Sequence, residues 1–293
     1  MDGVIVVDKA SGWTSHDVVN KMRRIAGTRR VGHLGTLDPM ATGVLPLIVG
    51  RATRLAQFFV KTDKVYEGTI RFGQATNTYD AEGEPVGEAK PFLATPESVE
   101  PLLAAFRGTI LQMPPPVSAK KINGQPAYKL VRKNLPVELK AVEVTVHELT
   151  LLGCGGADAQ VRVHCSSGTY LRAIAHDAGQ AAGVGAHLAA LRRLRAGDFA
   201  IEEARTLDEL QELSAQGRLG EALLGCATLL PEFPNCPVDR LTESQIRQGR
   251  DFRTSPFRTP PGTRYVKAIG EDGALVAIGE AVLPNLYHPM LVL

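Results

Sequence analysis

The stretch that decides the fold runs from Arg30 to Gly50 and reads RVGHLGTLDPMATGVLPLIVG. Its second half, from Val44 to Val49, is apolar and predicts a strand buried in the core. Its first half is rich in glycine, which lets the backbone approach a ligand closely, and it carries one acidic side chain, Asp38. An Asp before a Pro is commonly a turn residue whose carboxylate bonds nearby backbone groups. The pattern alone therefore leaves Asp38 open as a turn residue or as a catalytic group.

The size and charge of the chain limit its class without deciding its function. Its 293 residues suffice for a sizeable core and predict two domains. The net charge of +2 and the pI near 8.3 do not establish a nucleic-acid partner, since such domains typically have a pI above about 9. Basic residues nevertheless cluster around a helix expected from Ser15 to Gly27, at Arg29 and Arg30, and again within 118–133. Each cluster is either a solvated face or a phosphate-contacting surface.

Several classes of protein are disfavoured by motifs that the sequence lacks. None of the four cysteines forms a C-x-x-C pair or has a histidine at zinc-like spacing, so reduced cysteines and a cytoplasmic location are expected. The apolar run Val4 to Val7 is too short for a signal peptide, and no stretch approaches the ~18 apolar residues of a membrane span. No glycine-rich phosphate loop or metal motif occurs, so we expect neither cofactor nor metal.

The remaining patterns predict the order of elements. Val65 to Phe72 alternates as a strand, in which Tyr66 could be an ordinary core tyrosine. Leucines recur every third residue in 186–195, which predicts a helix, and 207–224 is predicted to be an amphipathic helix. Prolines between 231 and 237 indicate a boundary between domains at 1–230 and 231–293, and the second domain is predicted to be small and rich in β-strands.

Three separated segments share a pattern with one enzyme family. His33 to Gly43 reads H-x-G-x-L-D-P-x-A-T-G, Lys64 to Tyr66 reads K-x-Y, and Gly168 to Arg172 reads GTYLR. The motifs GAHL at 185–188 and LRRL at 191–194 follow. Together these segments resemble the pseudouridine synthases, specifically the bacterial TruB family of tRNA pseudouridine-55 synthases. The resemblance covers roughly residues 3–230 and departs from the family pattern at Ala10, where proline is usual.

The resemblance implies a fold and an activity. The fold would be of the α+β class: a large mixed, mainly antiparallel sheet flanked by helices, with a small β-rich PUA-like C-terminal domain. The activity would be isomerisation of the T-loop uridine of tRNA, at position 55, to pseudouridine without a cofactor. The N1–C1′ bond breaks, the uracil turns over, and it rejoins through C5. The partner would be the T-arm stem-loop, bound by a monomer with no membrane and no obligate protein partner.

The resemblance also assigns site residues. Asp38 would be the catalytic carboxylate, Arg172 its ion-pair partner, and Tyr66 the aromatic side chain that stacks on the uracil. A base inside folded RNA must be flipped out to reach such a pocket. The side chains expected to contact RNA are His33, which would fill the space left by the base, the apolar wall Leu191, and Lys9, Asp80, Lys120 and Arg30.

Two alternatives use the same basic segments without catalysis. One is a tRNA chaperone that binds and remodels the T-arm, and the other is an RNA-binding ribosome-assembly factor with a degenerate site. Neither needs a carboxylate at position 38, so the intact Asp38, Tyr66 and Arg172 favour the enzyme. Chaperone activity can coexist with catalysis. Whether Asp38 attacks carbon or removes a proton stays open at this point.

Overall fold

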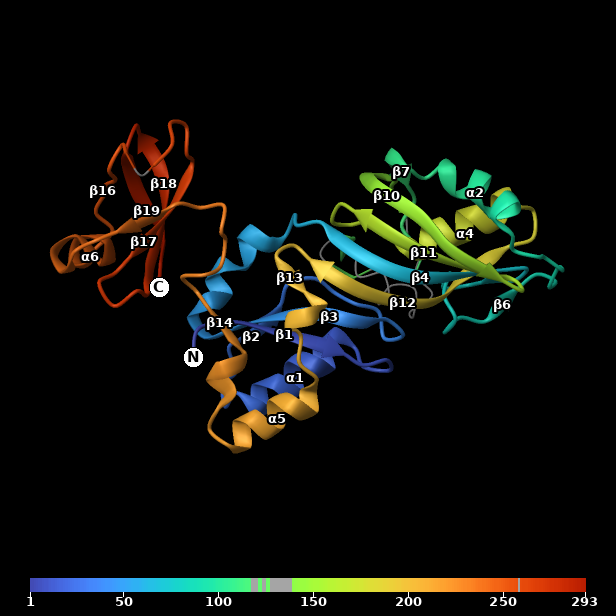
Figure 1. The fold of residues 1–293 in the computed structure, drawn as a ribbon, viewed down its shortest axis with the longest axis horizontal. Coiled ribbons are helices and arrows are strands. Elements are labelled where there is room, and N and C mark those ends of the chain that lie inside the picture. Colours follow the sequence, from blue (N-terminus) through green and yellow to red (C-terminus); the bar gives the residue numbers. More distant parts are fainter. Residues whose placement is uncertain (117–120, 123–124, 127–138, 258) are drawn as a thin grey trace.

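A computed structural model describes residues 1–116, 121–122, 125–126, 139–257 and 259–293, organised around one large sheet (Figure 1). The ten strands of this sheet are β1 (Gly3–Lys9), β2 (Val31–His33), β3 (Thr42–Val49), β4 (Lys64–Phe72), β7 (Gly108–Gln112), β10 (Val142–Gly155), β11 (Asp158–Cys165), β12 (Ala186–Ala196), β13 (Phe199–Ala200) and β14 (Leu223–Gly225). Two short pairs lie outside it: β5 (Ala75–Thr76) with β6 (Pro85–Val86), and β8 (Lys121–Ile122) with β9 (Gln125–Pro126).

The strands of the large sheet follow the order β14-β1-β3-β12-β4-β11-β10-β7, with β2 paired to β3 and β13 paired to β12. Strands β3 and β12 run parallel, and the other pairs described in this sheet are antiparallel. The predicted α+β class, with a large mixed, mainly antiparallel sheet, is therefore confirmed.

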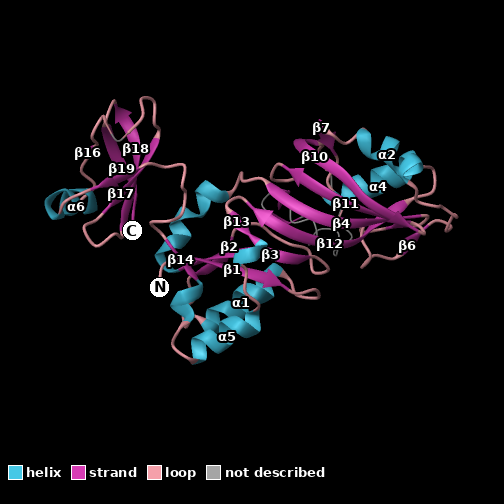
Figure 2. Ribbon diagram, viewed as in Figure 1, coloured by secondary structure: helices cyan, strands magenta, loops and turns pink. Residues whose placement is uncertain are grey.

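Helices cover this sheet at both ends (Figure 2). The helices among the described residues of the whole chain are α1 (Ser15–Ile25), α2 (Pro96–Ala104), α4 (Leu171–Ala181), α5 (Leu207–Ala215) and, in the C-terminal part, α6 (Arg240–Arg247). The 3-10 turns are η1 (Gly50–Phe59), η2 (Ile201–Glu203) and η3 (Leu219–Ala222). Helices α1 and α5 lie side by side near β1, whereas α2 and α4 lie at the far end, near β10 and β12 (Figure 1).

The N-terminal strands are buried on both faces. Along β1, Ile5 and Val7 belong to the core cluster under α1 and α5, whereas Val4 and Val6 belong to a second cluster on the opposite face. A strand covered on both faces is apolar throughout rather than alternating. This explains the unbroken apolar run that was visible in the sequence at β1 and, from Val44 to Val49, in β3.

The helix predicted over 186–195 is wrong, because these residues form β12, which pairs with β4. The pairing register shifts twice, between Leu188 and Ala190 and between Arg193 and Arg195. Each bulge adds one residue to the strand and delays its alternation by one position. The resulting spacing of three between leucines imitates a helical period.

The helix predicted over 207–224 is also too long. Helix α5 begins at Leu207 as expected, and a capping box precedes it, in which the Glu209 backbone N–H donates to the Thr206 hydroxyl. It ends at Ala215, and Gly217 then adopts a left-handed φ of 72°. The chain continues through η3 into the edge strand β14 rather than through further helical turns.

A second, five-stranded sheet forms the C-terminal part of the chain. Its strands are β15 (Asn235–Pro237), β16 (Phe252–Arg253), β17 (Tyr265–Ile269), β18 (Leu275–Leu283) and β19 (Leu286–Val292), in the order β15-β17-β18-β19-β16. Helix α6 is capped by Asp239, whose carboxylate accepts from the Thr242 backbone N–H at 2.7 Å. The predicted domain boundary after residue 230 falls between β14 and β15.

The two sheets are joined by an apolar contact through η1. The ring of Phe58 meets Phe233 and Tyr265 edge-on, with centroids 5.4 and 5.6 Å apart. Leu291 and Leu293 at the C-terminus belong to the same core cluster as Val4 and Val6. The C-terminal sheet is therefore attached to the large sheet through shared core rather than through a linker alone.

Candidate active site

Asp38 lies in the loop between β2 and β3, which is anchored from below by two buried polar side chains. The Ser15 hydroxyl, at the start of α1, accepts from the Leu37 backbone N–H at 2.8 Å and donates to the Leu37 carbonyl at 3.0 Å. The fully buried ammonium of Lys9 donates to the carbonyl of Pro39 at 3.0 Å. The backbone on both sides of Asp38 is thus held by hydrogen bonds to buried side chains.

Arg193 from β12 anchors the other arm of the same loop. Its guanidinium is buried and donates to the carbonyls of Val44 at 2.7 Å, Gly35 at 3.1 Å and Thr36 at 3.3 Å. Strands β12 and β3 come very close here, because Gly43 has φ 96° and a Cβ on it would lie 2.2 Å from the Arg193 carbonyl oxygen. Glycine is therefore required at position 43 for the loop to reach the arginine.

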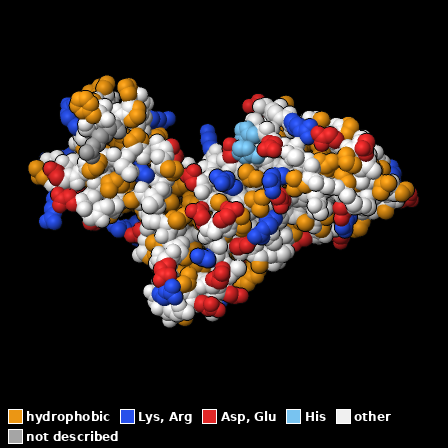
Figure 3. Space-filling view, in the orientation of Figure 1, with side chains coloured by type: hydrophobic (Ala, Val, Ile, Leu, Met, Phe, Trp, Pro, Cys, Tyr) orange, Lys and Arg blue, Asp and Glu red, His pale blue; other side chains and the backbone are white. Residues whose placement is uncertain are grey.

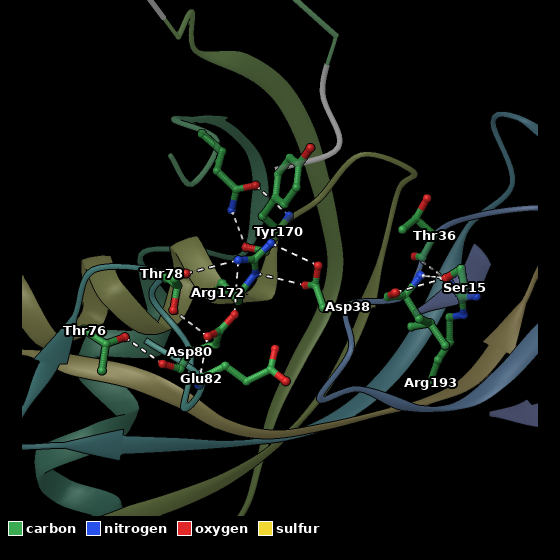
Figure 4. Close-up of polar contacts among 12 residues, drawn as sticks. Ser15, Thr36, Asp38, Thr76, Thr78, Asp80, Glu82, Tyr170, Arg172 and Arg193 are labelled. Carbon is green, nitrogen blue, oxygen red and sulfur yellow. Dashed lines mark hydrogen bonds and ion pairs between the residues drawn. The ribbon is translucent and has the colours of Figure 1, made fainter. Parts of the chain in front are cut away.

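The carboxylate of Asp38 faces Arg172, the second residue of α4 (Figure 4). Arg172 Nη2 lies 3.1 Å from Asp38 Oδ1, and Nε lies 3.0 Å from Oδ2. The other side of the same guanidinium contacts Asp80 Oδ2 at 3.1 Å and the Thr78 carbonyl at 3.1 Å. Asp80 is itself held by the Thr78 hydroxyl and by the Glu82 backbone N–H. One buried arginine therefore links two carboxylates and fixes the orientation of Asp38.

The pKa of Asp38 depends on its burial and on the charges of the neighbouring side chains. Burial raises the pKa of Asp38 most strongly, and Asp80 adds to that rise, whereas the positive charges of Arg172 and Lys9 oppose it. Burial also raises the pKa of Glu82, with Asp80 and Asp38 contributing. The site thus concentrates acidic groups around one guanidinium, which is typical of sites that tune a carboxylate for chemistry.

The Asp38–Arg172 pair lies at the wall of a cavity of about 640 Å³, within the size range of small-ligand sites. Tyr66 from β4 and Leu191 from β12 line the same cavity, as does Arg193. Tyr66 is buried, and burial raises the pKa of its phenol. A flat aromatic side chain, an apolar wall and an oriented carboxylate thus converge on one space large enough for a nucleobase.

The structure brings together five of the nine predicted site residues: Asp38, Arg172, Asp80, Tyr66 and Leu191. Lys9 lies beneath the loop, where its ammonium also donates to the carbonyls of Ala10 and Trp13, so it holds backbone and does not face the cavity.

Two further residues predicted to contact RNA, His33 and Arg30, are not part of the described cavity lining. His33 ends β2, and its Nδ1 is buried without a hydrogen-bond partner among the described residues. Burial and the nearby Arg193 lower the pKa of His33. Arg30 is exposed just before β2, and Lys120 lies outside the described residues.

The prediction from sequence missed Ser15 and Arg193 as parts of the site. Arg193 belongs to the LRRL motif, in which two adjacent arginines look equivalent. The structure separates them: Arg193 is buried under the loop, whereas Arg192 forms a partly exposed ion pair with Asp8 at 2.8 Å. Side chains of consecutive strand residues point to opposite faces of the sheet, so assigning this segment to a strand would have distinguished Arg193 from Arg192.

Two family models match consecutive parts of the chain. Residues 23–171 match the N-terminal domain of the TruB family pseudouridylate synthases, and residues 172–231 match the C-terminal domain of tRNA pseudouridylate synthase B. The fold and the site thus place the chain among the pseudouridine synthases. It belongs to the TruB family and is a tRNA pseudouridine synthase, an isomerase that acts on uridine in tRNA.

Curated relatives support this assignment along the whole chain. The tRNA pseudouridine synthase B of Solibacter usitatus (strain Ellin6076) is 59% identical over 293 residues, and the match covers 100% of this chain and 100% of the relative. The tRNA pseudouridine synthase B of Thermobifida fusca (strain YX) is 47% identical over 290 residues, covering 95% of this chain and 94% of the relative.

Solved structures share the fold. A structure of an H/ACA ribonucleoprotein bound to a substrate RNA containing 2'-deoxyuridine has a TM-score of 0.72 at 24% identity, covering 99% of this chain and 84% of that chain. A Cbf5-Nop10-Gar1 complex has a TM-score of 0.70 at 26% identity, and the match covers 97% of this chain and 79% of that chain. Within the described residues, no helix is both long and apolar enough to cross a membrane.

Proposed function

We propose that this chain isomerises the uridine at position 55, in the T-loop of tRNA, with Asp38 as the catalytic carboxylate. The observation that carries the proposal is the two-point contact between Asp38 and Arg172 at the wall of a cavity lined by Tyr66. An oriented carboxylate beside a flat aromatic ring is the arrangement that glycosidic-bond isomerisation of a single base needs. No metal or redox group enters the proposed reaction.

The proposed mechanism assigns each group a task. Asp38 acts as a carboxylate on the nucleotide as the N1–C1′ bond breaks, and the positive charge of Arg172 opposes the rise in pKa that burial causes. Tyr66 stacks on the uracil while it turns over, and Leu191 closes the apolar side of the cavity. C5 then bonds to C1′, and the proton on C5 is lost as the N1 position regains one. Reactant and product have the same composition.

We propose that the T-arm approaches over the exposed basic residues that lead into the Asp38 loop. Arg24, Arg29 and Arg30 are exposed, and the structure describes no ion pair for their side chains. Lys21 instead donates to Gln211, and Arg23 to Asn20 and the Val31 carbonyl. Three such cations along one approach can contact phosphates and fix the register of the RNA. We propose that the enzyme does this as a monomer in the cytoplasm, without an obligate protein partner.

The test is release of tritium from a T-arm stem-loop transcript labelled at C5 of uridine. The native protein should release the label, and Asp38→Asn should release none while binding the transcript with similar affinity. Asp158→Asn is the matched control, because Asp158 pairs with Arg71 at 2.7 Å on the surface, away from the cavity. If Asp38→Asn lost transcript binding and tritium release to the same extent, Asp38 would have a structural role rather than a catalytic one. Release from a transcript that lacks the position-55 uridine would refute the site assignment.

We also propose that binding remodels the T-arm, as a tRNA chaperone would. The cavity admits a base only after that base has left its stack, because Tyr66 and Arg172 are both buried. Extrusion costs a few kcal/mol, which the binding contacts must supply before any chemistry. Asp38→Asn should therefore still accelerate refolding of a misfolded tRNA transcript. The recovery of aminoacylation capacity by the transcript measures this refolding. Loss of that effect together with catalysis would exclude a separate chaperone role.

A further inference from the structure

Two histidines and an aspartate meet on the surface of the large sheet. His147 Nε2 lies 3.1 Å and His164 Nε2 lies 3.7 Å from the same oxygen, Oδ2 of Asp63. The two imidazole rings are 4.7 Å apart, and the three ligand atoms all lie within 4.8 Å of one another. Each side chain is roughly two-fifths exposed, and a patch of histidine beside acidic atoms is visible on the face shown in Figure 3.

A bulge in β10 creates this cluster. Val146 pairs with Cys165 and Glu148 pairs with His164, so His147 is the extra residue that opposes no partner. Bulges re-aim side chains. His147 and Glu148 are consecutively exposed between the buried Val146 and Leu149, which a regular strand would not allow. The bulge therefore turns His147 to the face of His164, where Asp63 arrives from the turn before β4.

The distances suit a single bound cation. Zinc lies 2.0–2.1 Å from imidazole nitrogen and 2.0–2.2 Å from carboxylate oxygen, so tetrahedral ligands are about 3.3 Å apart. The measured separations of 3.1 and 3.7 Å lie on either side of that value. Two imidazoles with one carboxylate form a donor set that suits borderline transition metals rather than Mg²⁺ or Ca²⁺, which prefer oxygen alone.

We propose that Asp63, His147 and His164 bind one divalent transition-metal ion, with Zn²⁺ as the reference ion. The ion joins β10, β11 and the turn into β4, which are adjacent in the sheet. Glu148 is not a member of the set, and its carboxylate accepts a 3.0 Å hydrogen bond from the Thr150 hydroxyl. The ion therefore keeps at least one coordination position open to solvent. None of the three ligands lines the Asp38 cavity as described.

The site has a structural link to that cavity. Asp63 is followed by Lys64, whose side chain lines the cavity and donates to the Thr62 carbonyl. The backbone carbonyl of Asp63 accepts from Gly197 N–H at 2.8 Å, which ties this turn to the end of β12. A metal held at Asp63 thus fixes the turn from which one wall of the cavity starts.

The test is isothermal titration of the full-length chain with Zn²⁺, after chelator treatment. The native protein should bind one ion that His147→Ala, His164→Ala and Asp63→Asn each weaken at least about tenfold, since loss of an outer-shell contact alone costs about 10–100-fold. His288→Ala is the matched control, because His288 Nδ1 lies 2.7 Å from Asp251 and no third ligand is described beside it. Its affinity for Zn²⁺ should equal that of the native protein.

A second readout separates this site from binding elsewhere. Co²⁺ bound by two imidazoles and a carboxylate gives visible ligand-field bands, and those of the native protein should vanish in His164→Ala and persist in His288→Ala. Zn²⁺ bound instead by the half-exposed Cys154 or Cys226 would titrate identically in all variants. That result, or the absence of saturable binding by the native protein, would overturn the proposal. The proposed reaction at Asp38 stands or falls separately, by tritium release.

Discussion

The ammonium of Lys9 lies 3.0 Å from the carbonyl oxygen of Pro39, the residue that directly follows Asp38. The same ammonium donates to the carbonyls of Ala10 at 2.9 Å and Trp13 at 2.7 Å. Burial lowers the pKa of Lys9 to about 8, against the opposing charge of Asp38, so the group is still protonated at pH 7. One buried charge therefore joins the turn after β1 to the Asp38 loop. It stabilises that turn where the family's usual proline is replaced by Ala10.

Lys9→Met should destabilise the fold by about 2 kcal/mol, because the carbonyls of Ala10 and Trp13 lose a buried donor. The Pro39 carbonyl is less affected, since it also accepts from the Gly12 N–H at 2.9 Å. Urea unfolding followed by circular dichroism measures the change. Lys21→Met, at a lysine bonded to an exposed Gln211, is the control and should leave the midpoint nearly unchanged. Equal effects of the two substitutions would contradict a special role for Lys9.

Arg193→Lys should lower kcat about 10- to 100-fold with little change in KM. Three different nitrogens of Arg193, Nε, Nη2 and Nη1, donate to the carbonyls of Val44, Gly35 and Thr36, and one ammonium nitrogen cannot occupy all three positions. A resulting shift of about 1 Å in the loop misplaces Asp38. Single-turnover kinetics on a T-arm transcript measure it. Arg192→Lys is the neighbouring control, because Arg192 pairs with Asp8 at a partly exposed position. A loss in KM alone would assign Arg193 to RNA binding instead.

Asp80→Asn should move the acid limb of the pH profile of kcat/KM to lower pH. Asp38 must be ionised to act, and burial raises its pKa, so activity is lost as pH falls through that raised value. Asp80 contributes to the rise, and removing its charge lowers the pKa of Asp38. The pH dependence of tritium release measures the limb, with Asp158→Asn as a remote control. A shift to higher pH would mean that Asp80 acts chiefly by holding Arg172.

Replacing Arg29 and Arg30 together by Ala should weaken transcript binding and flatten its salt dependence. Each lost phosphate contact reduces the slope of log K against log[salt] by about 0.7–0.9. Filter binding between low and moderate salt measures the slope. Arg218→Ala is the control for loss of a surface arginine, because Arg218 pairs with Glu221 on the surface of another element. An unchanged slope in the double variant would place that segment away from the RNA.

Much of the fold was predictable because it depends on local apolar patterns and on one extended motif. The strand in 44–49 and the caps of α1 and α2 follow from residues close in sequence, and the mixed, mainly antiparallel sheet was expected from the resemblance. The pairing of Asp38 with Arg172 was also expected from the resemblance, and the structure contains the contact. The roles of these residues in catalysis stay predictions.

What could not be predicted depends on bulges. The two register shifts in β12 disguised a strand as a helix, and with it the difference between Arg192 and Arg193. The bulge at His147 likewise hid its proximity to His164 and Asp63. A bulge is set by pairing between distant strands rather than by the residue that protrudes. No local pattern in the sequence therefore marks it.

The core shared between β1 and the C-terminus sets an order of events during synthesis. Val4 and Val6 emerge from the ribosome long before Leu291 and Leu293, which belong to the same cluster. Until β19 has been made, this face of β1 lacks part of its cover, and such exposed apolar surface favours aggregation. The nascent chain is therefore vulnerable while β19 is missing, and a chain truncated before β19 would carry the full set of active-site residues without being able to close its core.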